Sequence, residues 1–408
     1  MDVVVERCCG LDVHKKNVVA CVRTTESAQV RKFGTLTQEL LRLLDWLHAE
    51  QVTVLAMEST GSYWKPVYNL FEGQGIELML VNPAHMKAVP GRKTDVKDAQ
   101  WIADLLRHGL LTASRIPERP QRELQEAVRY RQSLVEDRAD EVRRLQKVLE
   151  GGNIKLGDVA SDVLGRSGRM MLEELAGGET DSDRMAGLAR GRLRNKRVSL
   201  TLALQGSIGS HQRFMLKRLL EHIDFLEQEI AALSQEIEAR MLPFEPILVR
   251  LDEIPGVGRR TAETILAEIG TDMSYWRNDK AFASWAKLSP GNNESAGKRR
   301  SSSIGRGRQS LRGALVEAAR SAVRVQASYF AALFKRLKAK RGSKRALIAV
   351  AHAMLVAVYH MLKEGTYYQD LGSDHFDRRD REAIVRRNVR RLESLGYHVS
   401  LAPAHDCT

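Results

Sequence analysis

The stretch "CCGLDVHKKNVVACV", residues 8–22, decides how the chain begins to fold. Its first apolar run leads to a single carboxylate, Asp12, and a second apolar run follows almost at once. Short valine-rich runs of this kind predict β-strands. An acidic residue between two segments with core character is either a turn residue or a ligand, and the surrounding sequence has to distinguish the two.

Outward from this stretch, short β-rich runs alternate with helical segments as far as about residue 113. The runs "VTVLAMES" (52–59) and "GIELMLV" (75–81) predict further strands, and "LTQELLRLLDWLHAE" (36–50) predicts a helix. Strands joined by helical crossovers favour an α/β layer fold. We therefore predict an α/β domain over residues 1–118.

The composition favours a nucleic-acid partner. The chain has 408 residues, 43% of them hydrophobic, which suffices for two or three domains. Lysine and arginine number 64 against 51 acidic residues, so the net charge is +13, and such an excess fits an acidic polymer better than it fits a merely soluble basic protein. No apolar run approaches the roughly 18 residues of a membrane span, and the acidic start lacks the basic region of a signal peptide. We expect a cytoplasmic protein without a membrane partner.

The cysteines give no sign of a metal site. Cys8, Cys9, Cys21 and Cys407 form no CxxC pair and have no metal-ligand spacing. We expect reduced thiols and no zinc centre.

Two long helices with heptad patterns predict a coiled-coil region over residues 119–242. The first, 121–150, carries one column: Val128, Val135, Val142 and Leu149. The second carries two columns: Leu216, Ile223, Ile230 and Ile237, and Leu219, Leu226 and Leu233. These helices pair either with each other or with another subunit, and the glycine-broken stretch 151–210 between them predicts short helices and loops. Beyond it we predict an all-α region over 243–371 and a charged helical appendage over 372–408.

Three more acids accompany Asp12. Glu58 ends the strand at 52–59, and "KTDVKDAQWIADLL" (93–106) begins a helix with Asp95 and Asp98 on one face. In a ribonuclease-H-like sheet two such strands lie side by side beneath a helix, so we expect the four acids to converge. Converging carboxylates require cations, and oxygen ligands suit Mg²⁺ or Mn²⁺; two ions about 4 Å apart would assist a phosphodiester exchange. The alternative is four unrelated charges, with the helical pair beside the positive end of its helix.

A glycine hairpin in the third region predicts a phosphate contact. In "IPGVGRRTAETILAEIG" (254–270), the pattern of a helix-hairpin-helix, Gly256 and Gly258 let backbone amides approach a phosphate. Arg259 and Arg260 add positive charge beside them. The alternative is a plain turn between two helices.

The stretch "LSPGNNESAGKRRSSSIGRG" (288–307) predicts a loop that holds Ser295 among phosphate-binding cations. The cations are Lys298, Arg299, Arg300, Arg306 and Arg308. Because a serine needs a metal or a base to become a nucleophile, the local chemistry alone favours a hydrogen bond to phosphate. A second basic run, 335–346, either contacts a nucleic-acid backbone or is a solvated connector.

These motifs, together with "GLDVHK" (10–15), "MESTGSYW" (57–64) and "NPAHMKAVPGRKTDVKDAQWIADLLRHGLL" (82–111), carry a family resemblance. As a set they resemble the transposases of the IS110 (IS-one-ten) group of bacterial insertion sequences, the DEDD transposases related to the Piv DNA invertase. The resemblance implies a RuvC-like domain, a coiled coil and a transposase domain. It implies that Asp12, Glu58, Asp95 and Asp98 bind metal.

The resemblance also implies a mechanism. Ser295 becomes the nucleophile, activated by the metals of the acids, although this chain has Ala296 where many relatives have glycine. A structured guide (bridge) RNA pairs with donor and target DNA, and the protein works as a homodimer or homotetramer in which the acids of one subunit meet the serine of another. We expect RNA-guided, metal-dependent strand exchange through a covalent phosphoserine intermediate, in a bacterial cytoplasm and at the nucleoid when active.

Two other functions fit parts of the pattern. A RuvC-type structure-selective endonuclease would use the same acids with water as the nucleophile, but it leaves the serine loop and its arginines without a role. A non-catalytic nucleic-acid-binding protein would use only the basic segments, with salt-dependent binding and no metal requirement.

Overall fold

The computed structural model describes residues 2–59, 61–82, 95–290, 293–295, 298–301 and 309–401, with only the backbone described at 95–97, 293–295 and 298–301. The chain divides into two compact units, Met1–Glu118 and Arg119–Thr408. The first is a mixed α/β unit and the second is almost entirely helical. This confirms the predicted combination of an α/β part with an all-α part.

The first unit is built on a five-stranded sheet with the order β3-β2-β1-β4-β5. Its strands are β1 (Cys8–Val13), β2 (Asn17–Arg23), β3 (Ala28–Gly34), β4 (Val54–Glu58) and β5 (Glu77–Val81). The first three are antiparallel, whereas β4 runs parallel to β1 and to β5. The helices are α1 (Thr37–Ala49), α2 (Trp64–Phe71) and α4 (Asp95–Arg107). This arrangement is consistent with a ribonuclease-H-like fold.

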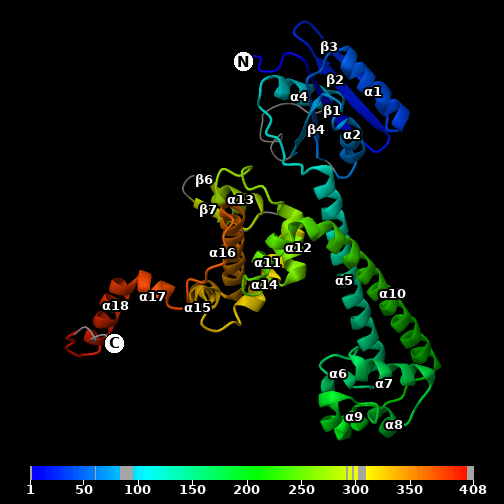
Figure 1. The fold of residues 1–408 in the computed structure, drawn as a ribbon, viewed down its shortest axis with the longest axis vertical. Helices are drawn as coiled ribbons and strands as arrows, with labels where there is room; N and C mark the ends of the chain where they lie inside the picture. Colours follow the sequence, from blue (N-terminus) through cyan, green and yellow to red (C-terminus); the bar gives the residue numbers. More distant parts are fainter. Residues whose placement is uncertain are drawn as a thin grey trace. The chain divides into compact units, whose positions relative to one another are not determined.

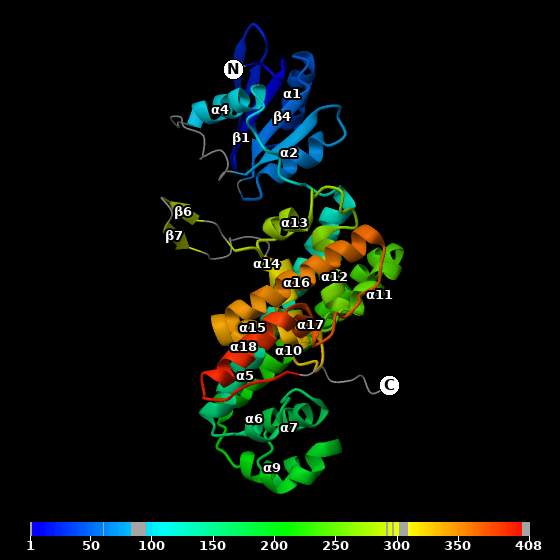
Figure 2. The same ribbon diagram turned by 90° about the vertical axis from the view of Figure 1, so that its left-hand side faces the viewer.

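The two faces of the sheet are covered by different helices (Figure 2). Side chains alternate between the faces of a strand, so Leu11 of β1 packs in the core formed with α1 and α2. Cys8, three residues earlier on the same strand, belongs to a cluster with Ile102 and Leu106 of α4. Asp12 is an even number of positions from Cys8 along β1, so its side chain lies on the same face of the sheet, which α4 covers.

Gly10 allows α4 to lie directly on β1. A Cβ placed on Gly10 would lie 2.3 Å from the backbone oxygen of Ala99 and 2.4 Å from the backbone nitrogen of Ala103. No side chain larger than hydrogen fits there without movement of the helix. The small residues of this seam thus determine how close the helix comes to the strand that carries Asp12.

In the second unit, α5 (Arg119–Gly151) and α10 (Ser210–Met241) run side by side within one chain (Figure 1). Ion pairs join Glu123 to Arg240 at 3.3 Å and Arg138 to Glu227 at 2.5 Å, so the helices are antiparallel. Of the two pairings left open by the sequence, the structure has the intrachain one. Between them lie α6 (Leu156–Val159), α7 (Arg166–Gly177), α8 (Ser182–Ala186), η1 (Gly191–Lys196) and α9 (Arg197–Ala203), packed around a core of their own.

The predicted heptad columns are confirmed on α10 and are wrong in part on α5. All members of the α10 columns are buried or nearly so, Leu233 being the least buried. On α5, however, Val135 is 40% exposed, and Leu134 and Leu145 take its place in the core. The helix α5 packs on α10 along its whole length, while its second neighbour changes from α12 near its start to the α6–α9 cluster near its end.

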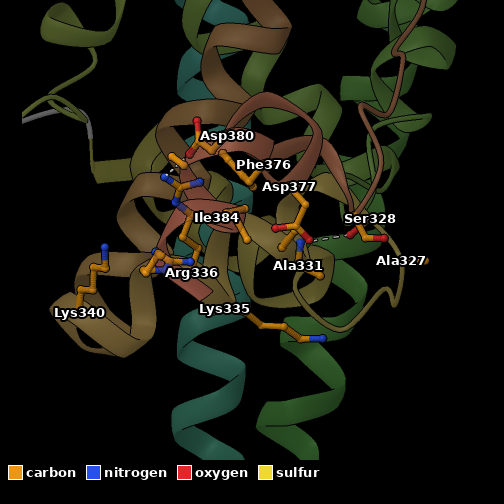
Figure 3. A pocket seen from close by; sticks show the side chains of 14 residues that line it. Ala327, Ser328, Ala331, Lys335, Arg336, Lys340, Phe376, Asp377, Asp380 and Ile384 are labelled. Carbon is orange, nitrogen blue, oxygen red and sulfur yellow. Dashed lines mark hydrogen bonds and ion pairs between the residues drawn. The ribbon is translucent and has the colours of Figure 1, made fainter. Parts of the chain in front are cut away.

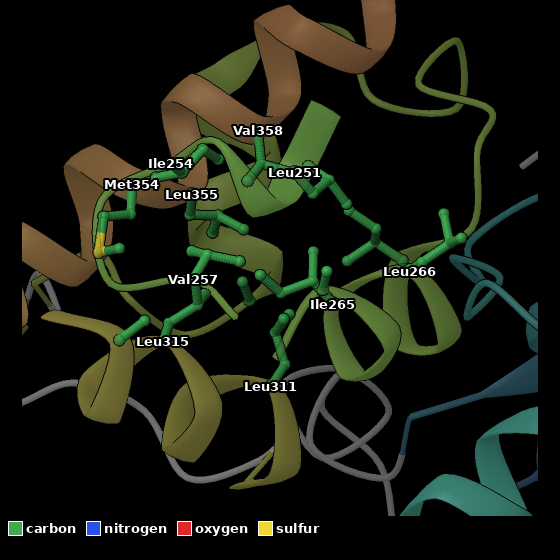
Figure 4. Packing of buried hydrophobic residues seen from close by; sticks show 14 of the residues in the cluster. Leu251, Ile254, Val257, Ile265, Leu266, Leu311, Leu315, Met354, Leu355 and Val358 are labelled. Atoms are coloured by element: carbon green, nitrogen blue, oxygen red, sulfur yellow. The ribbon is translucent and has the colours of Figure 1, made fainter. Parts of the chain in front are cut away.

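Most of the remaining elements contribute to a helical core (Figure 4), whereas α17 (His375–Arg379) and α18 (Arg381–Glu393) have no buried residues. The other elements are η2 (Leu242–Phe244), α11 (Glu245–Asp252), α12 (Arg259–Ile269), α13 (Asp279–Trp285), α14 (Gln309–Ala322), α15 (Tyr329–Arg341) and α16 (Ser343–Glu364). A two-stranded antiparallel sheet, β6 (Asn293–Ser295) and β7 (Lys298–Ser301), belongs to the same unit.

The expectation that no apolar run approaches the length of a membrane span is wrong for one helix. By length and composition α16 is apolar enough to cross a membrane. Its buried residues, among them Val350, Met354 and Val358, lie in the helical core with residues of α11, α12 and α14. Core helices of globular proteins can have the same length and composition, so α16 is only weak evidence for a membrane span.

Candidate functional site

Asp12 lies at the end of the central strand, where its side chain is 14% exposed. The imidazole Nε2 of His14 lies 3.0 Å from the Asp12 Oδ2. His14 follows directly after the last residue of β1, Val13, so a single residue separates it from Asp12 in the chain. The sequence analysis did not identify His14 as a neighbour of Asp12, although their separation of two residues would have indicated it.

Glu58 is beside Asp12 because the two strands are in register. Gly10 pairs with Ala56 and Leu11 with Met57, so the next pair along the parallel strands brings Asp12 next to Glu58. Because side chains alternate along each strand, both acids lie on the face of the sheet that α4 covers. The sheet therefore positions two of the four predicted acids side by side.

The helix α4 brings a third acid to the same place. Asp98 directly precedes Ala99, the residue whose backbone oxygen lies over Gly10. Burial raises the pKa of the Asp12 carboxyl, and repulsion from Asp98 and Glu58 raises it further, while His14 acts in the opposite direction. The negative charges of Asp98 and Glu58 thus lie close enough to act on Asp12. Asp95 is the first residue of the same helix, and its side chain lies outside the described residues.

The donor set fits a hard divalent cation. It consists of carboxylates, and burial together with repulsion from Asp98 and Glu58 makes the ionised form of Asp12 costly without a counter-charge. Among the side chains that the structure describes, no three histidine, cysteine or acidic groups already stand in a metal-binding arrangement. The fit therefore rests on the chemistry of the converging acids. Cys8, Cys9 and Cys21 are buried free thiols, as expected, and Cys407 lies outside the described residues.

Ser295 lies in the second unit, at the end of a strand. The sequence predicted a loop here, whereas the backbone at 293–295 and 298–301 forms the β6–β7 pair, in which Ser295 is opposite Lys298. Lys298, Arg299 and Arg300 all belong to β7, so three of the predicted cations lie on the strand that pairs with the strand of Ser295. Arg306 and Arg308 lie outside the described residues.

The glycines of the predicted phosphate contact differ in role. Gly256 has a φ of +85°, and a Cβ on it would lie 2.3 Å from the backbone oxygen of Ala318, so packing on α14 already requires glycine. Gly258 precedes the first residue of α12, and a Cβ there would meet nothing within 4 Å. Packing therefore does not require glycine at this position, which lies at the start of a helix.

The two arginines that follow differ as well. Arg259 donates to both carboxylate oxygens of Glu245, at 2.5 and 2.7 Å, and to Glu263 at 3.1 Å. These partners raise the pKa of the Arg259 guanidinium above its usual value. Arg260 is exposed and makes no ion pair in the described part of the chain. Arg260 is therefore the cation of this pair that is not already held by carboxylates.

Comparison with known proteins places both units among transposases. A family model described as a transposase, that of the DEDD type of IS110, matches residues 9–154, and the model described as "Transposase IS116/IS110/IS902 family" matches residues 249–335. The protein described as "Putative transposase y4qE" from Sinorhizobium fredii is 31% identical over 133 residues. That alignment covers 31% of this chain and 34% of the relative, so the chain spans about a third of the length of this curated relative.

Proposed function

The chain belongs to the IS110 family of transposases, and on that premise we propose that it exchanges DNA strands through a covalent phosphoserine intermediate guided by a structured RNA. The observation that carries the proposal is the convergence of Asp12, Glu58 and Asp98 on the α4 face of the first unit. This face coincides with the part of the chain matched by the DEDD transposase model. We also propose that the protein binds donor DNA, target DNA and a bridge RNA, and that it acts in the cytoplasm.

The acids are proposed to hold a divalent ion, Mg²⁺ or Mn²⁺. When bound, such ions stabilise charge on phosphodiester oxygens. Asp12 and Glu58 are fixed by the sheet, and Asp98 by the helix packed on Gly10, so this chain contributes rigid ligands. Asp95, one turn before Asp98 on α4, completes the proposed set.

Ser295 is the proposed nucleophile. Its Oγ bonds to a DNA phosphorus as the P–O bond to one deoxyribose oxygen breaks, the proton leaves the serine, and a DNA hydroxyl is released. A hydroxyl of the second DNA then attacks the phosphoserine and restores the free serine. Each step exchanges one phosphoester for another, so no external energy source is needed. The acids and Ser295 act from different subunits of a homodimer or homotetramer.

The basic residues beside the serine are proposed to hold the nucleic-acid backbone. Arg260 is exposed, and β7 brings a run of cations next to Ser295. The proposed contacts are Gly256, Gly258, Arg259, Arg260, Lys298, Arg299, Arg300, Arg306 and Arg308. Because Arg259 already pairs with Glu245 and Glu263, we expect Arg260 to contribute more to phosphate binding than Arg259.

A hydrolytic nuclease is the second candidate. It is favoured by one observation, namely that Asp12, Glu58 and Asp98 come together within the first unit without any residue of the second. Water would then replace Ser295, and no protein–DNA adduct would form.

A denaturing gel distinguishes these functions. Purified protein is incubated with Mg²⁺, labelled donor and target DNA and RNA from the flanking region of the element. Ser295→Ala is compared with the wild type and with Ser301→Ala, a control serine on β7 of the same hairpin. We expect a slowly migrating protein–DNA adduct in the wild type and in the control, and none in Ser295→Ala. Cleaved DNA from all three proteins without an adduct would instead establish hydrolysis.

A further inference from the structure

Two basic segments that are far apart in the sequence line one cavity. The cavity has a volume of about 470 Å³ and lies between α15 and the α17–α18 segment (Figure 3). On α15 it is lined by Lys335, Arg336 and Lys340, and on α18 by Arg387. Most of this segment lies outside the two matched family regions, which end at residue 335. Its role is therefore not covered by the family comparison.

Aromatic and ionic contacts hold the two sides together. Phe376 of α17 stacks on Tyr329 of α15 with ring centroids 5.4 Å apart. The Arg336 guanidinium lies over the ring of Phe376 at 4.8 Å and donates to Asp380 at 2.9 Å. These contacts attach the C-terminal segment to α15 and fix the width of the cavity.

The charge of the cavity fits an anionic polymer. Four cations face two carboxylates, and one of these, Asp380, is already neutralised by Arg336 and Arg379. Lys335, Lys340 and Arg387 are exposed and have no ion-pair partner in the described part of the chain. On α18, Arg390 and Arg391 lie three and four residues beyond Arg387, so the cations continue outward along the same face of that helix. A basic surface that extends beyond the cavity along α18 suits a phosphodiester backbone better than a small anion.

We propose that the groove between α15 and α18 is a nucleic-acid backbone site, separate from the Ser295 hairpin, in which Lys335, Lys340 and Arg387 contact phosphates. The site deepens the proposed function because it adds a binding surface for DNA or RNA. It does not depend on catalysis, since its residues are not among the acids or beside the serine.

The test measures the salt dependence of binding in EDTA, by fluorescence anisotropy, with a labelled DNA duplex and a labelled RNA hairpin. The groove variant is Lys335→Gln, Lys340→Gln and Arg387→Gln combined. The control, with the same loss of charge, is Arg190→Gln, Arg192→Gln and Arg194→Gln, which are exposed residues at and beside η1. Unchanged circular dichroism verifies that both variants are folded.

We expect the groove variant to lower the slope of log K against log salt by about 2–3 for at least one of the two probes, since each lost phosphate contact removes roughly 0.7–0.9. The control should change the slope by clearly less. The probe with the larger change identifies DNA or RNA as the ligand. An unchanged slope for both probes, or equal changes in the groove variant and the control, would overturn the proposal.

Phe376→Ala tests whether the groove needs both of its sides. It changes no charge, but it removes the ring that holds α17 against Tyr329 and Arg336. We expect the slope to fall by about 1, corresponding to the loss of Arg387 from the site; an unchanged slope would contradict a two-sided groove. Ser295→Ala should bind like the wild type here, so failure of the phosphoserine mechanism and failure of the groove are separate results.

Discussion

The backbone oxygen of Ala99 lies 2.3 Å from the position that a Cβ on Gly10 would occupy. This close approach connects the central strand to the helix that carries Asp98, because Ala99 follows Asp98 directly. The position of one acid relative to another thus depends on a glycine that has no chemistry of its own. Gly10 is therefore a positioning residue for the proposed metal site.

Gly10→Ala should damage both stability and activity. The added methyl group forces α4 away from β1, and overpacking of this kind costs about 1–3 kcal/mol. Urea unfolding should show this loss, and strand exchange should fall because Asp98 moves away from Asp12. Gly151→Ala is the matched control, since a Cβ there meets nothing within 4 Å. Equal behaviour of the two variants would argue against the proposed role of Gly10.

Asp12→Asn should stabilise the metal-free protein at neutral pH. Burial and the neighbouring acids raise the pKa of Asp12 above its ordinary 3.8, so the native state keeps the proton to a higher pH than the unfolded chain does. Stability from this group therefore falls as the pH rises from 3.8 through the native pKa. Urea unfolding in EDTA should show Asp12→Asn to be more stable than the wild type at pH 7 and similar to it at pH 3.

The control for this pH dependence is Asp45→Asn, which removes an exposed carboxylate from α1. Its effect on the free energy of unfolding should be small at both pH values. A gain in Asp12→Asn that is the same at pH 3 and pH 7 would mean that its charge is not the cause.

Binding of a divalent metal ion should stabilise the native state and offset the unfavourable burial of the Asp12 charge. A ligand that binds only the native state stabilises it, by about 2.7 kcal/mol at a hundred times the dissociation constant. Titration with Mg²⁺ or Mn²⁺ should raise the melting temperature of the wild type. The increase should disappear in Asp12→Asn and Asp98→Asn, and it should persist in Ser295→Ala. A similar increase in every variant would point to metal bound elsewhere.

Arg131 and Glu263 form a buried ion pair of 2.8 Å between α5 and α12, with each side chain 6% exposed. Arg131→Met leaves Glu263 buried with Arg259 as its remaining ion-pair partner in the described part of the chain, and loss of one partner of such a pair costs about 3–5 kcal/mol. We expect the lower end of this range in urea unfolding, and substantial recovery in Arg131→Met with Glu263→Leu.

The exposed pair of Arg138 and Glu227 provides the contrast to this buried pair. Arg138→Met should cost less than about 1 kcal/mol, because solvent screens surface ion pairs. If the two single variants were equally destabilised, burial of the Arg131 pair would not be the relevant difference.

Much of this architecture is readable from local patterns. The alternation of the strands, the acids at their ends and the heptads of α10 depend on neighbours within a few residues, and the period of a strand or helix places such neighbours directly. The same logic would have paired His14 with Asp12. The membrane-length appearance of α16 shows the limit, because apolar length does not distinguish a bilayer from the interior of a helical core.

Other features arise from contacts between distant segments. Val135 is exposed although it belongs to the heptad column, since no heptad count records which helices lie against α5. Gly256 is required by the backbone of α14, some sixty residues away in the chain. The groove exists because Phe376 stacks on Tyr329, which brings together two basic segments that are separately unremarkable. Residue types and their spacing thus establish the chemistry available to this protein, whereas packing across the sequence selects which groups meet, because close contact depends on shape and burial in three dimensions.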